Sequence, residues 1–376
     1  MTNEVQTTDA SDMNTNEVNI TEPMDQSAFT AVLDQGYRHV LPRAAYFDQR
    51  RIHGHKNAVV ILAQLTKEVL TKELVLHCVV NGMHTKNFRI QSFLMNNWIH
   101  RKYPHLTYDN VMIFCYDTTV NRDDTNTVII EYKNPKDDKS IISIKPEEAL
   151  FVPSFQPANK GRSSVMVCIT TFGNPPFIND WLRYQKTLGV DLVYINAQDS
   201  FLNSTVYSDA FFQESVDNGF VQVKVWKEYL TKMEIFYHSQ LLYYHDCLYR
   251  FQSIYDYAFI LDTDEFYVVK DGKVDVNIHK HLDTVFSQRS KVGALRLEQV
   301  IYRAPHGGFN HNNTELNNNG NLPRYAAKTS LKSNNFKSVS RLSTTVELSV
   351  HTVVGFMPGF REYPVPKHIA HVAHMK

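Results

Sequence analysis

Between residues 164 and 261 the sequence changes four times from an apolar run to a stretch with helical spacing. The apolar runs are residues 164–170, 192–195, 220–226 and 257–261. A continuous apolar run is typical of a parallel strand that is covered on both faces of its sheet. Parallel strands need crossover connections, which are usually helices. The alternation therefore predicts an α/β fold with a doubly wound, Rossmann-like sheet.

The stretches between these runs carry helix signals. Prolines at 175–176 open the first, where proline is tolerated, and Gly189 ends it. A second helical stretch passes through residues 210–212. The third has an apolar stripe spaced by four, three, four, three and four residues. Its members are Tyr237, Leu241, Tyr244, Leu248, Phe251 and Tyr255.

The fourth apolar run ends in Leu-Asp-Thr-Asp-Glu-Phe (261–266), which places three acids within four residues. In an open α/β sheet, ligands bind at the carboxyl ends of the strands. Asp262 and Asp264 are two residues apart, so on extended backbone they point the same way. Two hard oxygen donors suit Mg²⁺ or Mn²⁺ better than zinc. The motif therefore predicts a metal that binds a diphosphate, and a solvated acidic turn is the structural alternative.

The remaining sequence divides into two regions. Residues 1–45 are rich in Thr, Asn, Asp and Glu without a hydrophobic period, which predicts a disordered stem or linker. Residues 46–160 predict a β-rich accessory region that precedes a catalytic domain at 161–376. Turn residues such as Asn81-Gly82 separate its short β-like runs. These runs are residues 57–65, 73–80, 111–116 and 127–132.

Composition excludes several classes of function. Lys plus Arg and Asp plus Glu both number 39, so no global field draws the protein to nucleic acid. Hydrophobic residues make up 43% of the chain, which is enough for a sizeable core. We find no apolar run of membrane-spanning length and no signal-like N-terminus. We therefore expect no nucleic-acid partner and no membrane segment in this chain.

The cysteines and sequons bear on the compartment. None of the cysteines forms a Cys-x-x-Cys, which argues against a structural zinc site. An even number permits two disulfides in an oxidising compartment, and buried thiols fit a cytosolic protein equally well. If the chain is luminal, Cys78 and Cys115 are the expected pair. Sequons at Asn19, Asn203 and Asn312 lean toward a secretory location. The cysteines are Cys78, Cys115, Cys168 and Cys247.

The last third of the chain carries a basic stretch and a histidine repeat. No acid occurs between residues 316 and 346, where basic residues recur every four or five positions. Such a stretch can meet a phosphate or an anionic glycan, and a solvated face is the alternative. Residues 306–321 form a turn-rich loop that we expect to be mobile. The basic residues are Arg324, Lys328, Lys332, Lys337 and Arg341, and the histidines are His368, His371 and His374.

These landmarks together resemble glycosyltransferase family 92. The resemblance covers about residues 46–376, and several motifs in the right order make it specific. The motifs are Val-Cys-Ile-Thr (167–170), the Asn-Asp-Trp-Leu helix with its Leu-Gly-Val end (177–190), Asp-Cys-Leu-Tyr-Arg (246–250), Leu-Asp-Thr-Asp-Glu-Phe (261–266), Lys337-Ser338-Val339 with Arg341, His351, and His374-Met375-Lys376. The ending departs from the family, which has His-Tyr-Arg where this chain has His-Met-Lys.

The resemblance implies a GT-A-type catalytic domain. Such a domain transfers a hexose, usually galactose, from a UDP-sugar donor to a glycan acceptor with inversion. The resemblance also implies Mn²⁺ (or Mg²⁺) as cofactor and a location in a Golgi or secretory-pathway membrane. Within it Asp264 ligates the metal, and Asp262 contacts the metal or the ribose. His374 is the expected third ligand, with His371 as the alternative.

The resemblance places other residues at the donor. Lys337 is the expected cation beside the diphosphate, and Arg341 is the second candidate. Asp246 and Arg250 belong to a family motif that helps to build the donor site. Their spacing of four residues is equally explained by an ion pair on a helix surface.

Inversion requires a base that deprotonates the acceptor hydroxyl, and Glu298 and Glu315 are the candidates. Two other functions stay open. One is a catalytically inactive relative that binds glycans. The other is a hydrolase with Asp262 and Asp264 as acid and base, but their spacing is too short for the carboxylate gap of about 6.5–9.5 Å in inverting glycosidases.

Overall fold

The computed structural model describes most of the chain beyond residue 39. All described residues belong to one folded unit, 39–376. Residues 40–45, which the sequence assigned to a segment without structure, lie instead in β1 (Val40–Asp48), where Val40 and Leu41 are buried. The loop 306–321 lies outside the described residues. The described residues are 40–50, 52–55, 57–70, 75–92, 108–118, 127–134, 137–152, 162–171, 175, 178–226, 239–269, 277–303 and 327–375.

Residues 40–152 form two sheets. The first has the order β5–β6–β2–β1–β9 and the second the order β4–β3–β7–β8. Asn81 and Gly82, with φ of 50° and 76°, make the tight turn between β3 and β4, as an Asn-Gly pair favours. The strands are β2 (Ala58–Thr66), β3 (Leu76–Val80), β4 (Met83–His84), β5 (Phe88–Ser92), β6 (Tyr108–Cys115), β7 (Val128–Asn134), β8 (Asp137–Ile144) and β9 (Glu148–Val152), with the helix α2 (Lys67–Leu70).

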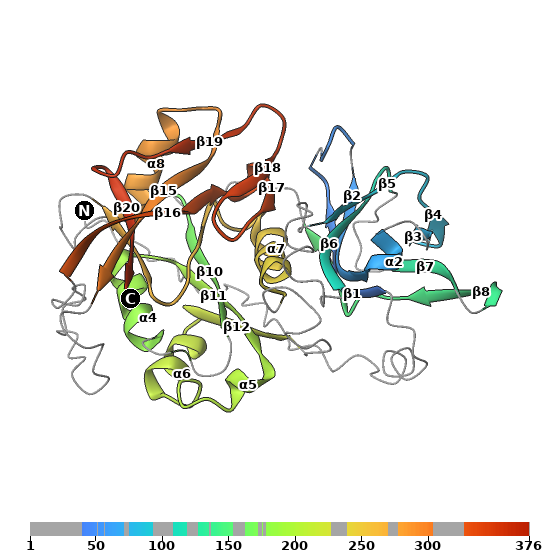
Figure 1. Cartoon of the computed structure of the whole chain (residues 1–376), viewed down its shortest axis with the longest axis horizontal. Coiled ribbons are helices and arrows are strands. Elements are labelled where there is room, and N and C mark those ends of the chain that lie inside the picture. Colours follow the sequence, from blue (N-terminus) through green and yellow to red (C-terminus); the bar gives the residue numbers. More distant parts are fainter. Residues whose placement is uncertain are drawn as a thin grey trace, which may run out of the picture. The chain divides into compact units, whose positions relative to one another are not determined.

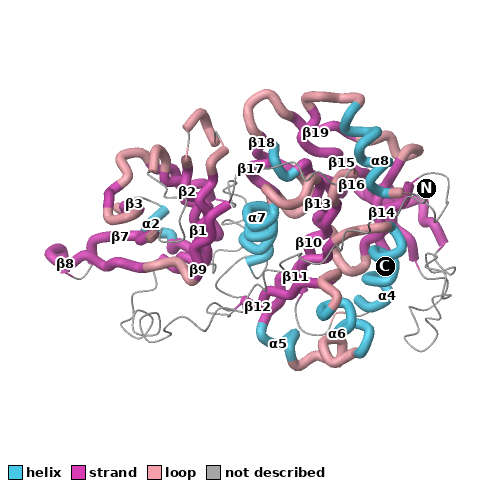
Figure 2. The backbone as a smooth tube through the Cα atoms, turned by 180° about the vertical axis from the view of Figure 1, so that it is seen from behind, coloured by secondary structure: helices cyan, strands magenta, loops and turns pink. Residues whose placement is uncertain are grey.

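The four apolar runs predicted as strands are β10 (Val165–Thr171), β11 (Leu192–Gln198), β12 (Val221–Trp226) and β13 (Tyr257–Ile260). They pair in parallel in the order β12–β11–β10–β13. Figure 1 labels β10, β11 and β12, and Figure 2 labels all four strands. β10, β11 and β13 are buried along their whole length, as expected of covered parallel strands, whereas Gln222 of β12 is exposed.

The sheet continues beyond β13 in the order β16–β15–β20–β14, and β19 pairs with β15. A separate hairpin consists of β17 and β18. These strands are β14 (Glu265–Val269), β15 (Val292–Arg303), β16 (Ala327–Arg341), β17 (Thr345–Leu348), β18 (Val353–Phe356), β19 (Arg361–Pro364) and β20 (Ala370–Met375). The protein is therefore a mixed α/β protein, which confirms the α/β class that the sequence predicted.

Some helix ends coincide with caps that the sequence supplies. Gly189, with φ of 90°, ends the first predicted helix. The carboxylate of Asp209 accepts hydrogen bonds from Phe211 N and Phe212 N at the start of α6. The helices are α4 (Ile178–Leu188), α5 (Asp199–Leu202), α6 (Ala210–Asp217), α7 (Gln240–Phe251) and α8 (Ile278–Ser287). Across the described ranges, none has the length and apolar character needed to cross a membrane.

Two disulfides fix elements that lie far apart in sequence. Cys78 of β3 is bonded to Cys115 of β6, which confirms the predicted pair. Cys168 of β10 is bonded to Cys247 of α7. α7 is buried along most of its length, and its apolar residues share a core cluster with residues of β1, β2, β10 and β13. This helix is thereby held against the central strand of the sheet.

Candidate functional site

The three acids lie where the parallel part of the sheet ends. Residues 261–264 form a turn between β13 and β14, closed by a hydrogen bond from Glu265 N to Asp262 O of 3.0 Å. The expectation that Asp262 and Asp264 sit on extended backbone is therefore wrong, and each contacts a different partner. We call residues 261–265 the acid turn.

Lys337 lies on β16, the strand next to β13, and its side chain reaches the acid turn. Its Nζ lies 2.9 Å from Asp262 Oδ2 and 3.0 Å from Glu265 Oε2. Burial works against the charge of Lys337, but Glu265, Tyr244 and Asp262 overcome it and raise its pKa. Lys337 and Glu265 are each 1% exposed, whereas Asp262 is 40% exposed. Lys337 thus holds one oxygen of Asp262 and leaves the other side of that carboxylate open to solvent.

Glu265 organises the turn from inside. Its Oε2 accepts a hydrogen bond of 2.9 Å from Asp262 N, and its Oε1 accepts one of 2.6 Å from Gln299 Nε2. Trp181 Nε1 of α4 donates to Glu265 O at 2.7 Å. Burial raises the pKa of Glu265, while Lys337 opposes that shift. Glu265 therefore makes contacts that orient its neighbours.

His374 of β20 reaches the other aspartate. β20 pairs antiparallel with β14, and His374 is the partner of Glu265 in that ladder. His374 Nε2 lies 2.9 Å from Asp264 Oδ2, and Met375 N donates to Asp264 O at 2.9 Å. Asp264 is 44% and His374 13% exposed. His371, the alternative ligand, contacts Tyr302 OH instead, because side chains three residues apart on a strand face opposite sides.

Other predicted site residues lie elsewhere. Glu298 is on the opposite face of β15 from Gln299, and its carboxylate binds Lys367 Nζ at 2.9 Å. Arg341 pairs with Tyr257 at the amino end of β13, and its guanidinium lies 4.9 Å from the centre of the Phe286 ring. Neither is brought to the acid turn. Glu315 lies outside the described residues, as does Arg324.

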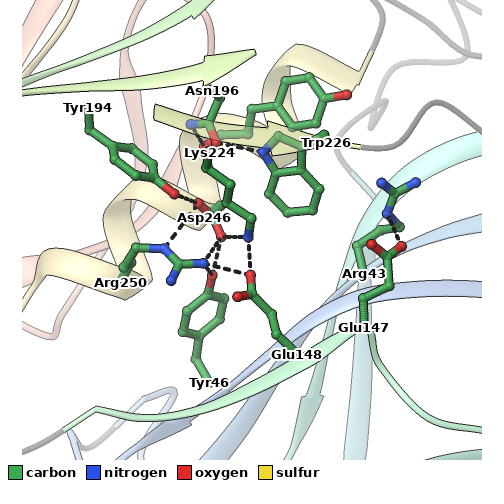
Figure 3. A network of polar contacts seen from close by, with 11 residues as sticks. Arg43, Tyr46, Glu147, Glu148, Tyr194, Asn196, Lys224, Trp226, Asp246 and Arg250 are labelled. Atoms are coloured by element: carbon green, nitrogen blue, oxygen red, sulfur yellow. Dashed lines mark hydrogen bonds and ion pairs between the residues drawn. The ribbon is translucent and has the colours of Figure 1, made fainter. Parts of the chain in front are cut away.

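Asp246 and Arg250 form an ion pair as their spacing predicts, but it is not on a helix surface (Figure 3). Asp246 is fully buried. Its Oδ1 accepts from Lys224 Nζ at 2.8 Å, Arg250 Nη2 at 3.0 Å and Tyr46 OH, and its Oδ2 accepts from Tyr194 OH at 2.7 Å.

Glu148 of β9 completes this group by binding both Lys224 and Arg250. We call Tyr46, Glu148, Tyr194, Lys224, Asp246 and Arg250 the Asp246 cluster. Burial opposes the charge of Asp246, but Arg250 and Lys224 outweigh burial and hold its pKa well below the usual range. Since both carboxylate oxygens are already bonded, direct contact of Asp246 with a donor would require these bonds to break.

Sequence reasoning missed several polar residues beside the acid turn. Gln299 shares a face of β15 with Leu295 and Leu297, both buried, so strand alternation was the signal that could have found it. At the start of α7, Gln240 Nε2 donates to Tyr244 OH at 2.7 Å and to Thr170 Oγ1 at 3.2 Å. The spacing of four between the two α7 residues was present in the sequence, but their partner on β10 was not evident.

The acid turn and β20 together place two metal-type donors side by side, Asp264 Oδ2 and His374 Nε2. Within the described part of the chain, no group of three or more His, Cys, Asp or Glu side chains is arranged to hold a metal ion. Nδ1 of His374 is buried without a hydrogen-bond partner among the described residues. The arrangement can therefore present one carboxylate and one imidazole to an ion, with further ligands coming from a bound molecule or water.

Comparison with known proteins gives one family. Residues 163–376 match the model of "Glycosyltransferase family 92". No curated protein sequence matches the chain. One solved structure, described as "Crystal Structure of a Mycobacterial Protein", resembles it with a TM-score of 0.23 and 11% sequence identity. That alignment covers 44% of this chain and 48% of the other, about half of each. A similarity this weak identifies neither a fold nor a function.

Proposed function

The chain belongs to glycosyltransferase family 92, and on that premise we propose that it transfers a hexose, galactose in the first instance, from a UDP-sugar to a glycan acceptor with inversion. The family itself implies a sugar donor and a glycan acceptor. The observation that carries the finer proposal is the Asp264–His374 pair, which is partly exposed at the carboxyl edge of the parallel strands. Ligands of open α/β sheets bind at that edge.

The proposal includes a GT-A-type fold for residues 161–376. Its support is the row of four parallel strands, β12–β11–β10–β13, with the acid turn directly after β13. Thr170 at the end of β10 lies at the same edge, and its hydroxyl accepts a hydrogen bond from Gln240 Nε2. A nucleoside diphosphate bound at this edge would need such hydrogen-bonding groups beside the acid turn.

A divalent ion, Mn²⁺ or Mg²⁺, fits the donors that are present. Two neighbouring ligands of an octahedral ion with bonds of about 2.1 Å lie about 3.0 Å apart. The separation of Asp264 Oδ2 and His374 Nε2 is 2.9 Å, which is the length of the hydrogen bond that joins them, so a bound ion would replace that bond. A carboxylate with an imidazole favours Mn²⁺ over Mg²⁺, which prefers an all-oxygen shell. When bound, the ion supplies positive charge that offsets the charge growing on the departing diphosphate.

The chain's own residues have distinct roles in this proposal. Asp264 and His374 hold the ion, and Asp262 offers its open oxygen to the ion or to the donor ribose. Lys337 and Glu265 fix the position of Asp262, because both are buried and both bond to it. The earlier assignment of Lys337 to the diphosphate gives way to this positioning role, since its Nζ already has two carboxylate partners.

The base for inversion remains one of the two glutamates suggested by the sequence. Glu298 would have to leave Lys367 and reach around β15, so the geometry disfavours it. Glu315 stays a candidate. Location in a Golgi or secretory-pathway membrane is also part of the proposal, and the two disulfides support it because such bonds persist in oxidising compartments.

Calorimetry with Mn²⁺ and UDP-galactose, followed by assay of released UDP, tests the proposal. The wild-type protein should bind the donor only with Mn²⁺ present and should release UDP. Asp264→Ala should lose Mn²⁺-dependent binding, because it removes one of the two donors. His374→Ala should lose most of the turnover for the same reason.

Two matched variants control for non-specific damage. Asp217→Ala removes an exposed carboxylate at the end of α6, and His368→Ala removes an exposed histidine that precedes β20. Both should bind the donor as the wild type does. Wild-type protein that binds a glycan but neither Mn²⁺ nor any UDP-sugar would identify an inactive relative instead. Unchanged binding in Asp264→Ala would refute the metal assignment.

A further inference from the structure

One sequon of the chain lies in a well-defined surface turn. Asn203-Ser204-Thr205 follows α5 and precedes α6. Ser204 N donates to Phe201 O at 3.0 Å, and Ser204 Oγ accepts from Tyr207 N at 3.1 Å. Ser204 is 8% and Phe201 0% exposed, so these two residues anchor the turn from inside. The residues on either side of Ser204 are both exposed.

The Asn203 side chain is available for chemistry. Its backbone has φ of −92° and ψ of 5°, the bridge conformation in which residue i+2 of a type I turn sits. Its side-chain amide makes no hydrogen bond with any described residue, and the residue is exposed. Reaction at Nδ2 would therefore break no stabilising contact. The third position is Thr205, and the middle position is not proline, so the acceptor pattern is complete.

The cysteines show which compartment suits this fold. All four are in disulfides, and each is at most 1% exposed. Disulfides form and persist in oxidising compartments such as the lumen of the endoplasmic reticulum. Asparagine glycosylation of Asn-x-Ser/Thr sites is a surface modification of proteins that pass through the secretory pathway. The disulfides and the exposed sequon thus point independently to the same pathway.

We propose that Asn203 carries an N-linked glycan. In the reaction, Asn203 Nδ2 forms a bond to the anomeric carbon of an oligosaccharide that is linked to a lipid diphosphate. The bond from that carbon to the diphosphate oxygen breaks, and the lipid diphosphate leaves with the electron pair. One Nδ2 proton passes to a base of the host's glycosylation enzyme. This makes the protein a substrate of glycan transfer, whatever reaction it performs itself.

The test uses the full chain, directed into the secretory pathway of a eukaryotic cell by a fused signal peptide. Purified protein is treated with a peptide N-glycosidase in heavy-oxygen water, and its peptides are mapped by mass spectrometry. Deglycosylation converts a modified asparagine to an aspartate that carries the heavy oxygen. The expected result is that label at position 203, in a sample whose non-reduced digest contains the Cys168–Cys247 pair.

Two variants at the third sequon position separate glycosylation from spontaneous deamidation. Thr205→Ala keeps Asn203 and destroys the acceptor pattern, so the label at 203 should be lost. Thr205→Ser keeps the pattern, so the label should remain. An unlabelled peptide from wild-type protein with intact disulfides would overturn the proposal, and so would a label that persists in Thr205→Ala. Neither result depends on transferase activity.

Discussion

The acid turn and the Asp246 cluster are both built around aspartates, but they differ in how exposed those aspartates are. Asp246 is fully buried, and both of its oxygens are bonded to other side chains. Asp262 and Asp264 are 40% and 44% exposed. Each uses only one carboxylate oxygen in its contacts with described residues.

This difference separates a group that maintains the fold from a group that is free to bind. Removing one partner of a buried ion pair leaves an uncompensated charge in the interior, which is costly. A half-exposed carboxylate is hydrated whether or not its partner is present, so its contacts add little to stability. The sequence alone does not show which of these aspartates is buried, and the comparison predicts opposite phenotypes for the two motifs.

The largest expected effect is on the Asp246 cluster. Asp246→Ala should lower the free energy of unfolding by about 3–5 kcal/mol, because it leaves Lys224 and Arg250 with only Glu148 as a counter-charge. Urea denaturation followed by circular dichroism measures the change. A loss below about 1 kcal/mol would place the cluster with ordinary surface pairs and remove the contrast.

A smaller loss is expected for Tyr194→Phe. This variant deletes one hydrogen bond to the ionised Asp246, which is worth about 1.5–3 kcal/mol. Tyr184→Phe is the matched control, because its hydroxyl donates at 2.6 Å to a neutral acceptor, Tyr267 O. That bond should be worth about 0.5–1.5 kcal/mol. Equal losses in the two variants, measured by the same denaturation, would contradict a charged acceptor in the cluster.

Acid titration should sharpen the contrast further. The folded state holds the pKa of Asp246 well below its ordinary value of about 3.9. Its stabilisation is therefore complete above about pH 5 and is lost as the pH falls from there through the depressed pKa. Compared with Asp246→Asn, the wild type should lose at most about 1.4 kcal/mol per pH unit in that window. Parallel stability curves for the two proteins below pH 4 would argue against an ionised Asp246.

The smallest effect on stability is expected at the acid turn. Asp264→Ala should change the free energy of unfolding by no more than about 0.5 kcal/mol, as for other substitutions near the surface. The same variant should have lost binding of Mn²⁺ and UDP-galactose. A destabilisation as large as that of Asp246→Ala would mean that the turn maintains the fold rather than a site.

The parts that sequence reasoning predicted are those encoded locally. The four parallel strands follow from continuous apolar runs, and the helix that ends at Gly189 follows from its spacing and its glycine. The Asp246–Arg250 pair follows from a separation of four residues. The burial of this pair does not follow from the local sequence, because Tyr46 lies 200 residues from Asp246 and Glu148 lies 102 residues from Arg250. Long-range partners of this kind leave no local pattern.

The candidate site shows the same limit. The place of the three acids was predicted from the apolar run before them, but their turn conformation was not. Lys337 and His374 were predicted from motifs of the resembled family. Which oxygen each of them contacts depends on how β16 and β20 are placed in the sheet. Gln299 and Glu298 are neighbours in sequence, but the register of β15 turns only Gln299 toward Glu265. That register is set by strands that lie far away in sequence.

The Asp246 cluster also bears on where this protein could be cut. The family match begins at residue 163, but Tyr46 and Glu148 come before it. A fragment that begins at residue 163 would keep Lys224 and Arg250 in place with Asp246 as their only acidic partner in the cluster. It would also uncover the apolar side of α7, which shares a core with β1 and β2. The segment that matches the family model is thus shorter than the segment that we expect to fold independently.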